Sequence, residues 1–257
     1  MSDSSNRNRS ALVTGSARRI GKAIAMGLAA DGWNVAIHHH QSEEAASQLA
    51  EELQTLGVRA AAVKCDLADA AAVTGLIGEC ERRIGPLSCL INNASLFEFD
   101  DPAGFDPATW EKHAAINLRA PLQLVREFAA QVPPDTVGCV VNMLDQKVFN
   151  LNPDFFSYTL TKVAMEGATR MLAMALAPKV RVCAIAPGIT LVSGEQTGEG
   201  FERAHAHAPM GRSSDVNDIV EAVRYLLAAK SVTGHTMIVD GGQHLWPLKR
   251  DVQFEVS

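Results

Sequence analysis

The chain has 257 residues, of which 47% are hydrophobic and 20% are charged, a composition that is ordinary for a soluble globular protein with one large α/β domain or two small ones. The net charge of −6 argues against nucleic acid or an anionic membrane as the main partner. No apolar stretch is long enough to span a membrane, and the polar N-terminus lacks the apolar region of a secretory signal. We therefore expect a cytoplasmic protein in which residues 1–9 form a disordered tail.

Seven short apolar runs, spread along the chain, predict β-strands. Most of them are continuously apolar rather than alternating, as in strands that are buried on both faces of a parallel sheet. The runs cover residues 11–15, 33–38, 60–66, 87–94, 138–144, 180–187 and 235–242.

Longer helical patterns separate these runs, at residues 19–31, 43–56, 69–84, 107–131, 155–177 and 215–229. The alternation contains no repeat or linker. It predicts a single Rossmann-type α/β domain over residues 10–257, a doubly wound parallel sheet of about seven strands with helices on both faces. The least regular stretch, residues 190–210, is Gly-rich and polar, and a long loop after the carboxyl end of a strand is a common ligand site.

The first predicted strand is followed by a turn, TGSARRIG (14–21), that opens a helix. Gly15 and Gly21 permit a tight turn, and the free N–H groups at the helix N-terminus favour an anion. Arg19 stands at the middle position of the usual glycine pattern. The alternative for Arg19 is a surface helix arginine, but with Arg18 it places two cations at the predicted anion site, so we favour a role in binding phosphate.

The second predicted strand ends in HHHQS (38–42). Folds that prefer NAD usually carry an Asp or Glu here to bind the ribose hydroxyls, and this chain has none. His39, His40 and Ser42, near Arg18, suit a 2′-phosphate instead, so we expect NADPH as the cofactor. A metal site is not expected, because successive strand residues alternate between faces and at most two of the three histidines converge.

The cysteines are widely scattered and form no CxxC motif. Buried, reduced thiols are the favoured interpretation, which suits a reducing cytoplasm. The positions are Cys65, Cys80, Cys89, Cys139 and Cys183.

The fifth apolar run ends at Asp145, and Tyr158 and Lys162 follow it, four residues apart. Taken alone, the Asp is typical of a turn cap and the Tyr/Lys pair of a helix surface. The alternative is catalytic. A cation one helical turn away favours phenolate and lowers the pKa of a tyrosine from its ordinary value of about 10, which makes it a better acid–base group.

A set of motifs, in order over nearly the whole chain, resembles the short-chain dehydrogenase/reductase family. The matching positions are Thr14, Gly15, Gly21, Asp66, Asn92, Asn93, Ala94, Asn117, Tyr158, Lys162, Pro187, Gly188, Asp240, Gly241 and Gly242. The resemblance implies hydride transfer with a nicotinamide cofactor. It also implies that Tyr158 is the acid–base group, that Lys162 assists it and holds a ribose hydroxyl, and that Asn117 supports the lysine through a water.

Two departures from the general family pattern resemble its pteridine reductase branch, which includes bacterial dihydromonapterin reductases. Asp145 stands thirteen residues before Tyr158, where most members have Ser, and Arg19 stands where most have Gly. Gln41 stands where some members of the branch have Arg. We therefore expect a weaker preference for NADPH over NADH, but still a preference for NADPH. Residues 38–42, 92–97 and 233–245 also resemble this branch.

The branch implies reduction of a pterin C=N bond, with the proton delivered by Tyr158 and Asp145. A carboxyl group accepts from ring N–H groups, or donates when protonated, whereas a serine hydroxyl suits a carbonyl oxygen. Phe97 is expected either to stack on the heterocycle or to pack on the core. The predicted substrate-binding residues are Arg19, Ser95, Phe97, Asp145, Tyr158 and Leu191, and the loop from Ser193 to Met210 is expected to line the pocket.

Motifs and resemblance together predict a cofactor site formed by Gly15, Arg18, Arg19, Ile20, Gly21, His39, His40, Ser42, Asp66, Leu67, Asn93, Ala94, Ser95, Tyr158, Lys162, Pro187, Gly188 and Thr190.

Two other functions stay open, a carbonyl or 3-oxoacyl reductase and a non-catalytic NADPH-binding protein, of which the second usually lacks the Tyr or the Lys. The family also implies a homotetramer or homodimer packed through residues 107–131 and 155–177, with which apolar Val163, Met171 and Met174 are compatible.

Overall fold

The computed structural model describes residues 9–192 and 197–255. They form the predicted single-domain α/β fold, with a seven-stranded sheet in the order β3-β2-β1-β4-β5-β6-β7 in which every neighbouring pair is parallel. Each predicted run matches its strand to within three residues at either end. The strands are β1 (Ser10–Val13), β2 (Asn34–His39), β3 (Ala60–Lys64), β4 (Cys89–Asn92), β5 (Gly138–Met143), β6 (Val180–Pro187) and β7 (Thr236–Val239).

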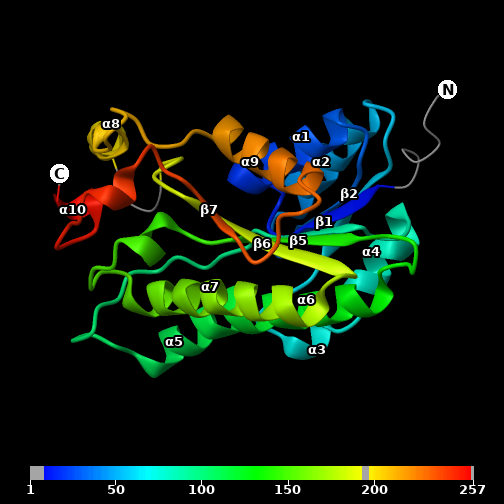
Figure 1. The fold of residues 1–257 in the computed structure, drawn as a ribbon, viewed down its shortest axis with the longest axis horizontal. Helices are drawn as coiled ribbons and strands as arrows, with labels where there is room; N and C mark the ends of the chain where they lie inside the picture. Colours follow the sequence, from blue (N-terminus) through cyan, green and yellow to red (C-terminus); the bar gives the residue numbers. More distant parts are fainter. Residues whose placement is uncertain (1–8, 193–196, 256–257) are drawn as a thin grey trace.

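Helices cover both faces of the sheet (Figure 1). One face carries α1 (Arg19–Ala30), α2 (Glu43–Gln54) and α9 (Val216–Ala228), and the other carries α4 (Leu76–Ile84), α6 (Ala120–Gln131) and α7 (Phe156–Leu176). Successive strand residues point to opposite faces, so each face has its own buried apolar cluster. Val13 and Val35 belong to one cluster, and Leu12 and Ala36 to the other. The doubly wound architecture is therefore confirmed.

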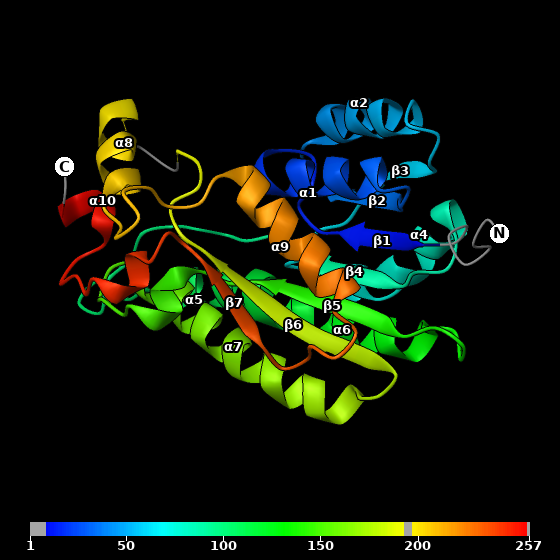
Figure 2. The same cartoon turned by 45° about the horizontal axis from the view of Figure 1, so that its top comes forward.

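The carboxyl ends of the strands lie at one edge of the sheet, and α8 (Gly198–Ala206) and α10 (Val252–Glu255) lie beyond that edge (Figure 2). The strand order reverses between β1 and β4, because β2 and β3 lie on one side and β5 to β7 on the other. The loops after β1 and β4 diverge at such a switch point and leave a crevice for a ligand.

The helix predicted at 69–84 is wrong as a single element. It is divided into α3 (Ala70–Val73) and α4, because Gly75 between them has a left-handed φ of 90° that a continuous helix does not allow. The helix predicted at 107–131 is continuous but not regular. It consists of α5 (Pro107–Ala114), a π-helical turn η2 (Ala115–Arg119) and α6.

The stretch 190–210 is not a plain loop, because it contains α8. The side chain of Thr197 accepts a hydrogen bond from the N–H of Gly200 at 3.1 Å and caps this helix, so a good cap offsets the poor helix propensity of its glycines. Residues 193–196, which include the predicted pocket residue Ser193, lie outside the described residues, as do residues 1–8 of the predicted tail. Among the described residues, no helix is long and apolar enough to cross a membrane.

Candidate active site

A cavity of about 680 Å³ lies at the carboxyl edge of the sheet. It brings together most of the predicted site residues, namely Gly15, Arg18, Arg19, Ile20, Gly21, His40, Asp66, Leu67, Asn93, Ala94, Ser95, Phe97, Asp145, Tyr158, Lys162, Pro187, Gly188, Thr190 and Leu191. Three of the individually predicted residues do not line it: His39, Ser42 and Asn117. The prediction that the loop to Met210 lines the pocket is wrong for its described residues 197–210, none of which lies in the cavity wall.

The turn between β1 and α1 forms a cradle that has no room for a side chain at either of its two glycines. Gly15 has a φ of 60°, and a Cβ atom there would lie 2.9 Å from the Cα atom of Ala94. A Cβ atom at Gly21 would lie 2.6 Å from the Nδ2 atom of Asn93. The hydroxyl of Thr14 accepts hydrogen bonds from the N–H groups of Asn93 and Ala94, both at 2.9 Å. The cradle is thus tied directly to the loop after β4.

Arg19 adopts the backbone conformation of the glycine that it replaces. Its φ is 56°, in the left-handed region, which costs a non-glycine residue about 1–2 kcal/mol. Arg18, by contrast, is extended, with a φ of −147°. Both side chains line the cavity, so the strained backbone at Arg19 adds a second guanidinium to the phosphate end.

His38 is a site residue that the sequence-based prediction missed. Its Nδ1 atom accepts a hydrogen bond from the N–H of Gly15 at 3.0 Å, and its Nε2 atom lies 3.1 Å from the carbonyl oxygen of Cys65. These contacts require a neutral ring with the proton on Nε2. Burial lowers the pKa of His38 to about 4, which favours that state. His38 therefore fixes the glycine turn to β2 and β3.

The histidines after His38 behave differently from one another. His39 is 4% exposed and lies off the cavity, because its strand position directs it to the opposite face. His40 lines the cavity, and its Nε2 atom lies 3.7 Å from a carboxylate oxygen of Asp66. Ser42 precedes α2 without a side-chain capping bond. Of the three polar residues predicted after β2, only His40 lies in the cavity wall.

Asn117 lies in the π-helical turn η2 and is 3% exposed. Its side chain accepts from the N–H of Leu96 at 2.8 Å, donates to the carbonyl oxygen of Leu96 at 2.9 Å and donates to Thr161 at 3.3 Å. Asn117 thus holds the loop after β4 against α7. Its predicted support of Lys162 through a water stays a prediction.

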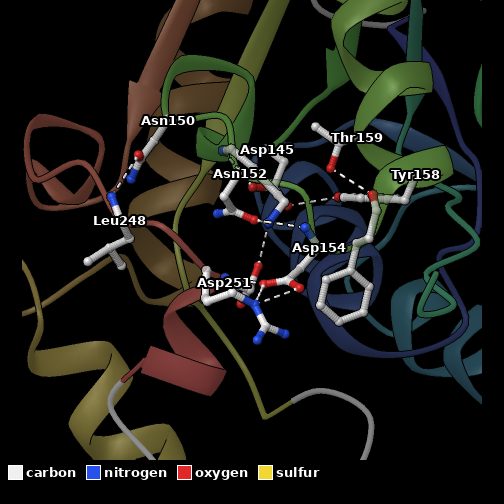
Figure 3. A network of polar contacts seen from close by, with 11 residues as sticks. Asp145, Asn150, Asn152, Asp154, Tyr158, Thr159, Leu248 and Asp251 are labelled. Carbon is white, nitrogen blue, oxygen red and sulfur yellow. Dashed lines mark hydrogen bonds and ion pairs between the residues drawn. The ribbon is translucent and has the colours of Figure 1, made fainter. Parts of the chain in front are cut away.

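Asp145 and Tyr158 are joined in the cavity wall (Figure 3). The hydroxyl of Tyr158 donates to Oδ2 of Asp145 at 2.8 Å. The other carboxylate oxygen accepts from the backbone N–H of Lys147 at 2.8 Å and caps the 3₁₀ turn η3 (Gln146–Phe149). Burial raises the pKa of Asp145, although these two hydrogen bonds oppose it. Asp145 therefore caps a turn and also contacts the tyrosine, and its catalytic role stays a prediction.

The pKa of Tyr158 is raised rather than lowered, so the expected net lowering by Lys162 is not found. The ammonium of Lys162 donates to the carbonyl oxygen of Met143 at 2.8 Å and lies 5.4 Å from the centroid of the Tyr158 ring. Burial lowers the pKa of Lys162 itself to about 8. Burial, followed by the carboxylate of Asp145, raises the pKa of Tyr158 well above its ordinary value. The structure thus holds Tyr158 as a neutral phenol, a proton donor.

Phe97 lies in the cavity wall, and one face of its ring is already covered. It stacks on Phe155 with ring centroids 4.1 Å apart and forms a T-shaped pair with Tyr158, with centroids 4.7 Å apart. The ring is 39% exposed. Packing against the protein is therefore established for Phe97, and stacking on a ligand stays a prediction.

The cavity also has a wall that the prediction missed entirely, formed by Asp251 and Val252. These residues follow the last strand, in a short polar segment without periodicity, and no local signal points to a site there. Gln146 and Lys147, from the turn after Asp145, line the same cavity. Their position directly after a predicted catalytic residue was the available signal.

The cysteine prediction is confirmed in that all five thiols are free and buried. Burial raises the pKa of each of them, so the unreactive thiol is favoured over the thiolate. Within residues 9–192 and 197–255, no group of three or more His, Cys, Asp or Glu side chains is arranged to hold a metal ion.

A glycine cradle at the switch point of a parallel sheet, next to a Tyr/Lys pair, defines a Rossmann-type oxidoreductase site. Residues 15–244 match the family model described as enoyl-(acyl carrier protein) reductase. The 3-oxoacyl-[acyl-carrier-protein] reductase FabG of Staphylococcus aureus is 31% identical over 92% of this chain and 98% of its own length. The chain therefore belongs to the short-chain dehydrogenase/reductase family.

Two solved structures have a higher sequence identity to this chain. FolM alternative dihydrofolate reductase 1 from Brucella suis, in complex with NADP, is 45% identical, with a TM-score of 0.91 over 94% of this chain and 98% of that one. The protein of the same name from Brucella canis, also complexed with NADP, is 43% identical, with a TM-score of 0.88 over 94% and 96%.

Proposed function

We propose that the protein is an NADPH-dependent reductase that reduces a C=N bond of a dihydropterin. The observation that carries this proposal is the 2.8 Å hydrogen bond between the Tyr158 hydroxyl and Asp145 in the cavity wall. A nitrogen heterocycle offers N–H groups and basic nitrogens that suit a carboxyl group, whereas a carbonyl oxygen needs only a donor. The similarity to two proteins named dihydrofolate reductase, at 43% and 45% identity, supports the same substrate class.

NADPH fits the cradle between β1 and β4. Gly15 and Gly21 let the turn after β1 pack closely on itself and on the loop after β4, and both line the cavity together with Arg18 and Arg19. No carboxylate stands at residues 38–42, where an NAD-preferring fold places one. Both Brucella proteins were solved with NADP. The bound cofactor supplies the hydride, and every other part of the reaction falls to the side chains.

The side chains hold and move the proton. Tyr158 is kept as a neutral phenol, and the pKa of Asp145 is raised, so this carboxyl takes up a proton at a higher pH than an exposed one. The pair can pass a proton between two oxygens that are already hydrogen-bonded and present it to a ring nitrogen. Lys162, with its pKa lowered to about 8, is an ammonium below that pH and stabilises the tyrosinate that remains.

The alternative is a carbonyl or 3-oxoacyl reductase. It is favoured by the similarity to FabG and by the description of the matching family model. A non-catalytic NADPH-binding protein ranks last, because Tyr158 and Lys162 are both present and lie in the cavity wall.

One experiment separates the three functions. The purified protein is given NADPH and, in turn, dihydrobiopterin, dihydromonapterin, dihydrofolate and a simple ketone, and NADPH oxidation is followed. We expect turnover of at least one dihydropterin and little of the ketone. Turnover of the ketone alone would establish the carbonyl reductase, and cofactor binding without any turnover would establish the non-catalytic protein.

The cofactor preference is tested by measuring dissociation constants. NADPH should bind more tightly than NADH, because Arg18 and His40 line the cavity where the 2′-phosphate is expected and charge-assisted hydrogen bonds contribute roughly 1.5–3 kcal/mol each. Equal constants, or tighter binding of NADH, would reject the preference.

We also propose that the chain forms dimers or tetramers through α5–α6 and α7. Met171 and Met174 on α7 are 71% and 82% exposed, and contiguous apolar side chains on a helix face favour a partner surface. Analytical ultracentrifugation tests this. A single species with the mass of one chain at micromolar concentration would contradict it.

A further inference from the structure

The cavity wall beside Asp145 contains a buried ion pair that the proposed mechanism does not use. The ammonium of Lys147 lies 2.8 Å from a carboxylate oxygen of Asp251 and also donates to the side chain of Asn152. The side chains of Lys147 and Asp251 are only 3% and 16% exposed, and both residues line the cavity. They are 104 residues apart in the sequence. A buried charge that loses its partner destabilises the folded protein. The free energy of folding therefore favours the position in which Lys147 and Asp251 are paired.

Other contacts anchor the same C-terminal segment to the loop between β5 and α7. Arg250 donates to both carboxylate oxygens of Asp154, at 3.0 and 2.8 Å, and the N–H of Asp251 donates to Asp154 at 2.7 Å. The N–H of Leu248 donates to Asn150 at 3.4 Å. Figure 3 shows these contacts together with the hydrogen bond between Asp145 and Tyr158. The segment therefore closes the cavity from the side of the proposed proton donors.

Lys147 connects this segment to Asp145. Its backbone N–H donates to Oδ1 of Asp145 at 2.8 Å, while its side chain bonds to Asp251. The charged or titratable groups that act on Asp145 are Tyr158 and Lys162 from α7, Lys147 from η3, and Asp251 from the C-terminal segment. Burial is the largest cause of the raised pKa of Asp145. The carboxylate of Asp251 adds to that shift, and the ammonium of Lys147 opposes it.

We propose that Lys147 and Asp251 form a positioning pair, which joins the C-terminal segment to η3 and holds the Asp145 carboxyl where it bonds to Tyr158. This rests on the proposed function, in which Asp145 and Tyr158 deliver the proton. Neither residue of the pair donates the proton itself. Their role is to fix the orientation of Asp145 and to set the charge around it.

The test compares the variants Lys147→Met and Asp251→Asn, the conservative variant Lys147→Arg, and Lys249→Gln as the matched control. Lys249→Gln removes an exposed charge from the same segment. We expect Lys147→Met and Asp251→Asn to lower kcat for the dihydropterin by about 10- to 100-fold, as displacement of a catalytic group does, with an unchanged dissociation constant for NADPH. Lys147→Arg keeps the positive charge and should retain most of the wild-type kcat. Lys249→Gln should have the same kcat and the same dissociation constant for NADPH as the wild type.

The second readout is the pKa of Asp145, followed by NMR of its labelled carboxyl carbon, which needs no substrate. Asp251→Asn removes a negative charge, so the pKa of Asp145 should fall. Lys147→Met removes a positive charge, so it should rise. A contact whose charges do not reach Asp145 predicts no such opposite shifts. If Lys147→Met does not fold, the near-isosteric Asp251→Asn decides the question by the downward shift alone.

The outcomes separate this proposal from the proposed function. If the wild type reduces no dihydropterin but the pKa of Asp145 still shifts in opposite directions, the substrate is wrong and the positioning pair stands. If the wild type reduces a dihydropterin and both variants keep its kcat and its Asp145 pKa, the pair is only a structural anchor and the proposal is overturned.

Discussion

The two ends of the cavity are built in different ways. The cofactor end is a backbone turn to which the cations of Arg18 and Arg19 are added, and in it Gly15 and Gly21 leave no room for a Cβ atom and a neutral His38 accepts one N–H. The substrate end consists of charged side chains under burial, in which Asp145 meets Tyr158 and Lys147 meets Asp251.

The difference shows what each end tolerates. At the cofactor end, binding depends on the close packing of the backbone. An added methyl group there should weaken cofactor binding, whereas a change of charge away from the phosphates should have little effect. At the substrate end the shape is set by pairs of opposite charges and shared protons, so an isosteric change of charge is harmful.

The largest expected effect is at Asp145. Asp145→Ser should lower kcat/KM for the dihydropterin by about 10²-fold or more, the low end of what a positioned proton-transfer group contributes. Activity on a simple ketone should persist or rise, since serine supplies the donor that a carbonyl oxygen needs. NADPH affinity should not change, because Asp145 lies at the other end of the cavity.

Asp145→Asn is the control for shape. The amide keeps an acceptor for the N–H of Lys147 but cannot relay a proton, so this variant should also be slow while melting close to the wild type. If Asp145→Ser melts many degrees lower and its folded fraction keeps full specific activity, then Asp145 acts only as the cap of η3.

The next effect concerns His38 at the cofactor end. Its pKa is lowered to about 4 in the folded protein, against 6.5 ordinarily, so unfolding takes up a proton between these two values. The free energy of unfolding should therefore fall as the pH drops from about 6.5 to about 4, by up to about 3 kcal/mol from this residue. His38→Gln removes this contribution and should flatten the pH dependence of urea unfolding.

His40→Gln is the matched control for His38, because it replaces an exposed imidazole two residues further on. It should leave the pH dependence of unfolding as it is in the wild type. An equally steep pH dependence in His38→Gln would show that the contact with Gly15 is not linked to folding.

A smaller effect is expected at Phe97. If its exposed part stacks on the pterin, Phe97→Ala should weaken substrate binding by about 1–3 kcal/mol, as loss of a base–aromatic stack does, with NADPH affinity nearly unchanged. Phe99→Ala is the control, because Phe99 also packs on Phe155, with centroids 5.3 Å apart, but does not line the cavity. Equal KM values for the two variants would leave Phe97 with packing as its role.

The smallest effect is at Arg19 and has two parts. Arg19→Gly should raise stability by about 1 kcal/mol, because glycine adopts a φ of 56° without strain, and it should weaken NADPH binding by loss of a cation. Arg18→Gly removes a cation from an extended backbone and should bring no such gain in melting temperature. A lower melting temperature for Arg19→Gly would show that its side chain stabilises the fold by more than the strain.

Most of the cofactor end was predictable because its signals are local. The glycine turn and the strands before and after it are read from neighbouring residues, and the parallel, doubly wound sheet follows from the alternation of strands and helices. The errors within regular structure also have local causes. Gly75 has a left-handed φ and ends the helix that was predicted at 69–84. Thr197 caps α8, which was not predicted because its first turn contains two glycines.

At the substrate end, the spacing of Asp145, Tyr158 and Lys162 carries a signal, and Ser95, Phe97 and Leu191 were also correctly placed in the cavity wall. The contact between Lys147 and Asp251 joins residues 104 positions apart, and neither residue has a motif around it. The direction of the Tyr158 pKa was wrong for a related reason, since burial depends on how distant segments pack. Charge pairs formed by folding cannot be read from local sequence.

The position of Asp251 and Val252 in the cavity wall also has a consequence for the order in which the enzyme is made. Ribosomes add residues from the N-terminus, so the cradle formed by β1 and β4 has all of its strands early in synthesis. The substrate end lacks one wall until every strand of the sheet has been translated and the segment after β7 has followed. A nascent chain can therefore acquire a place for its nucleotide well before it has a closed place for its substrate.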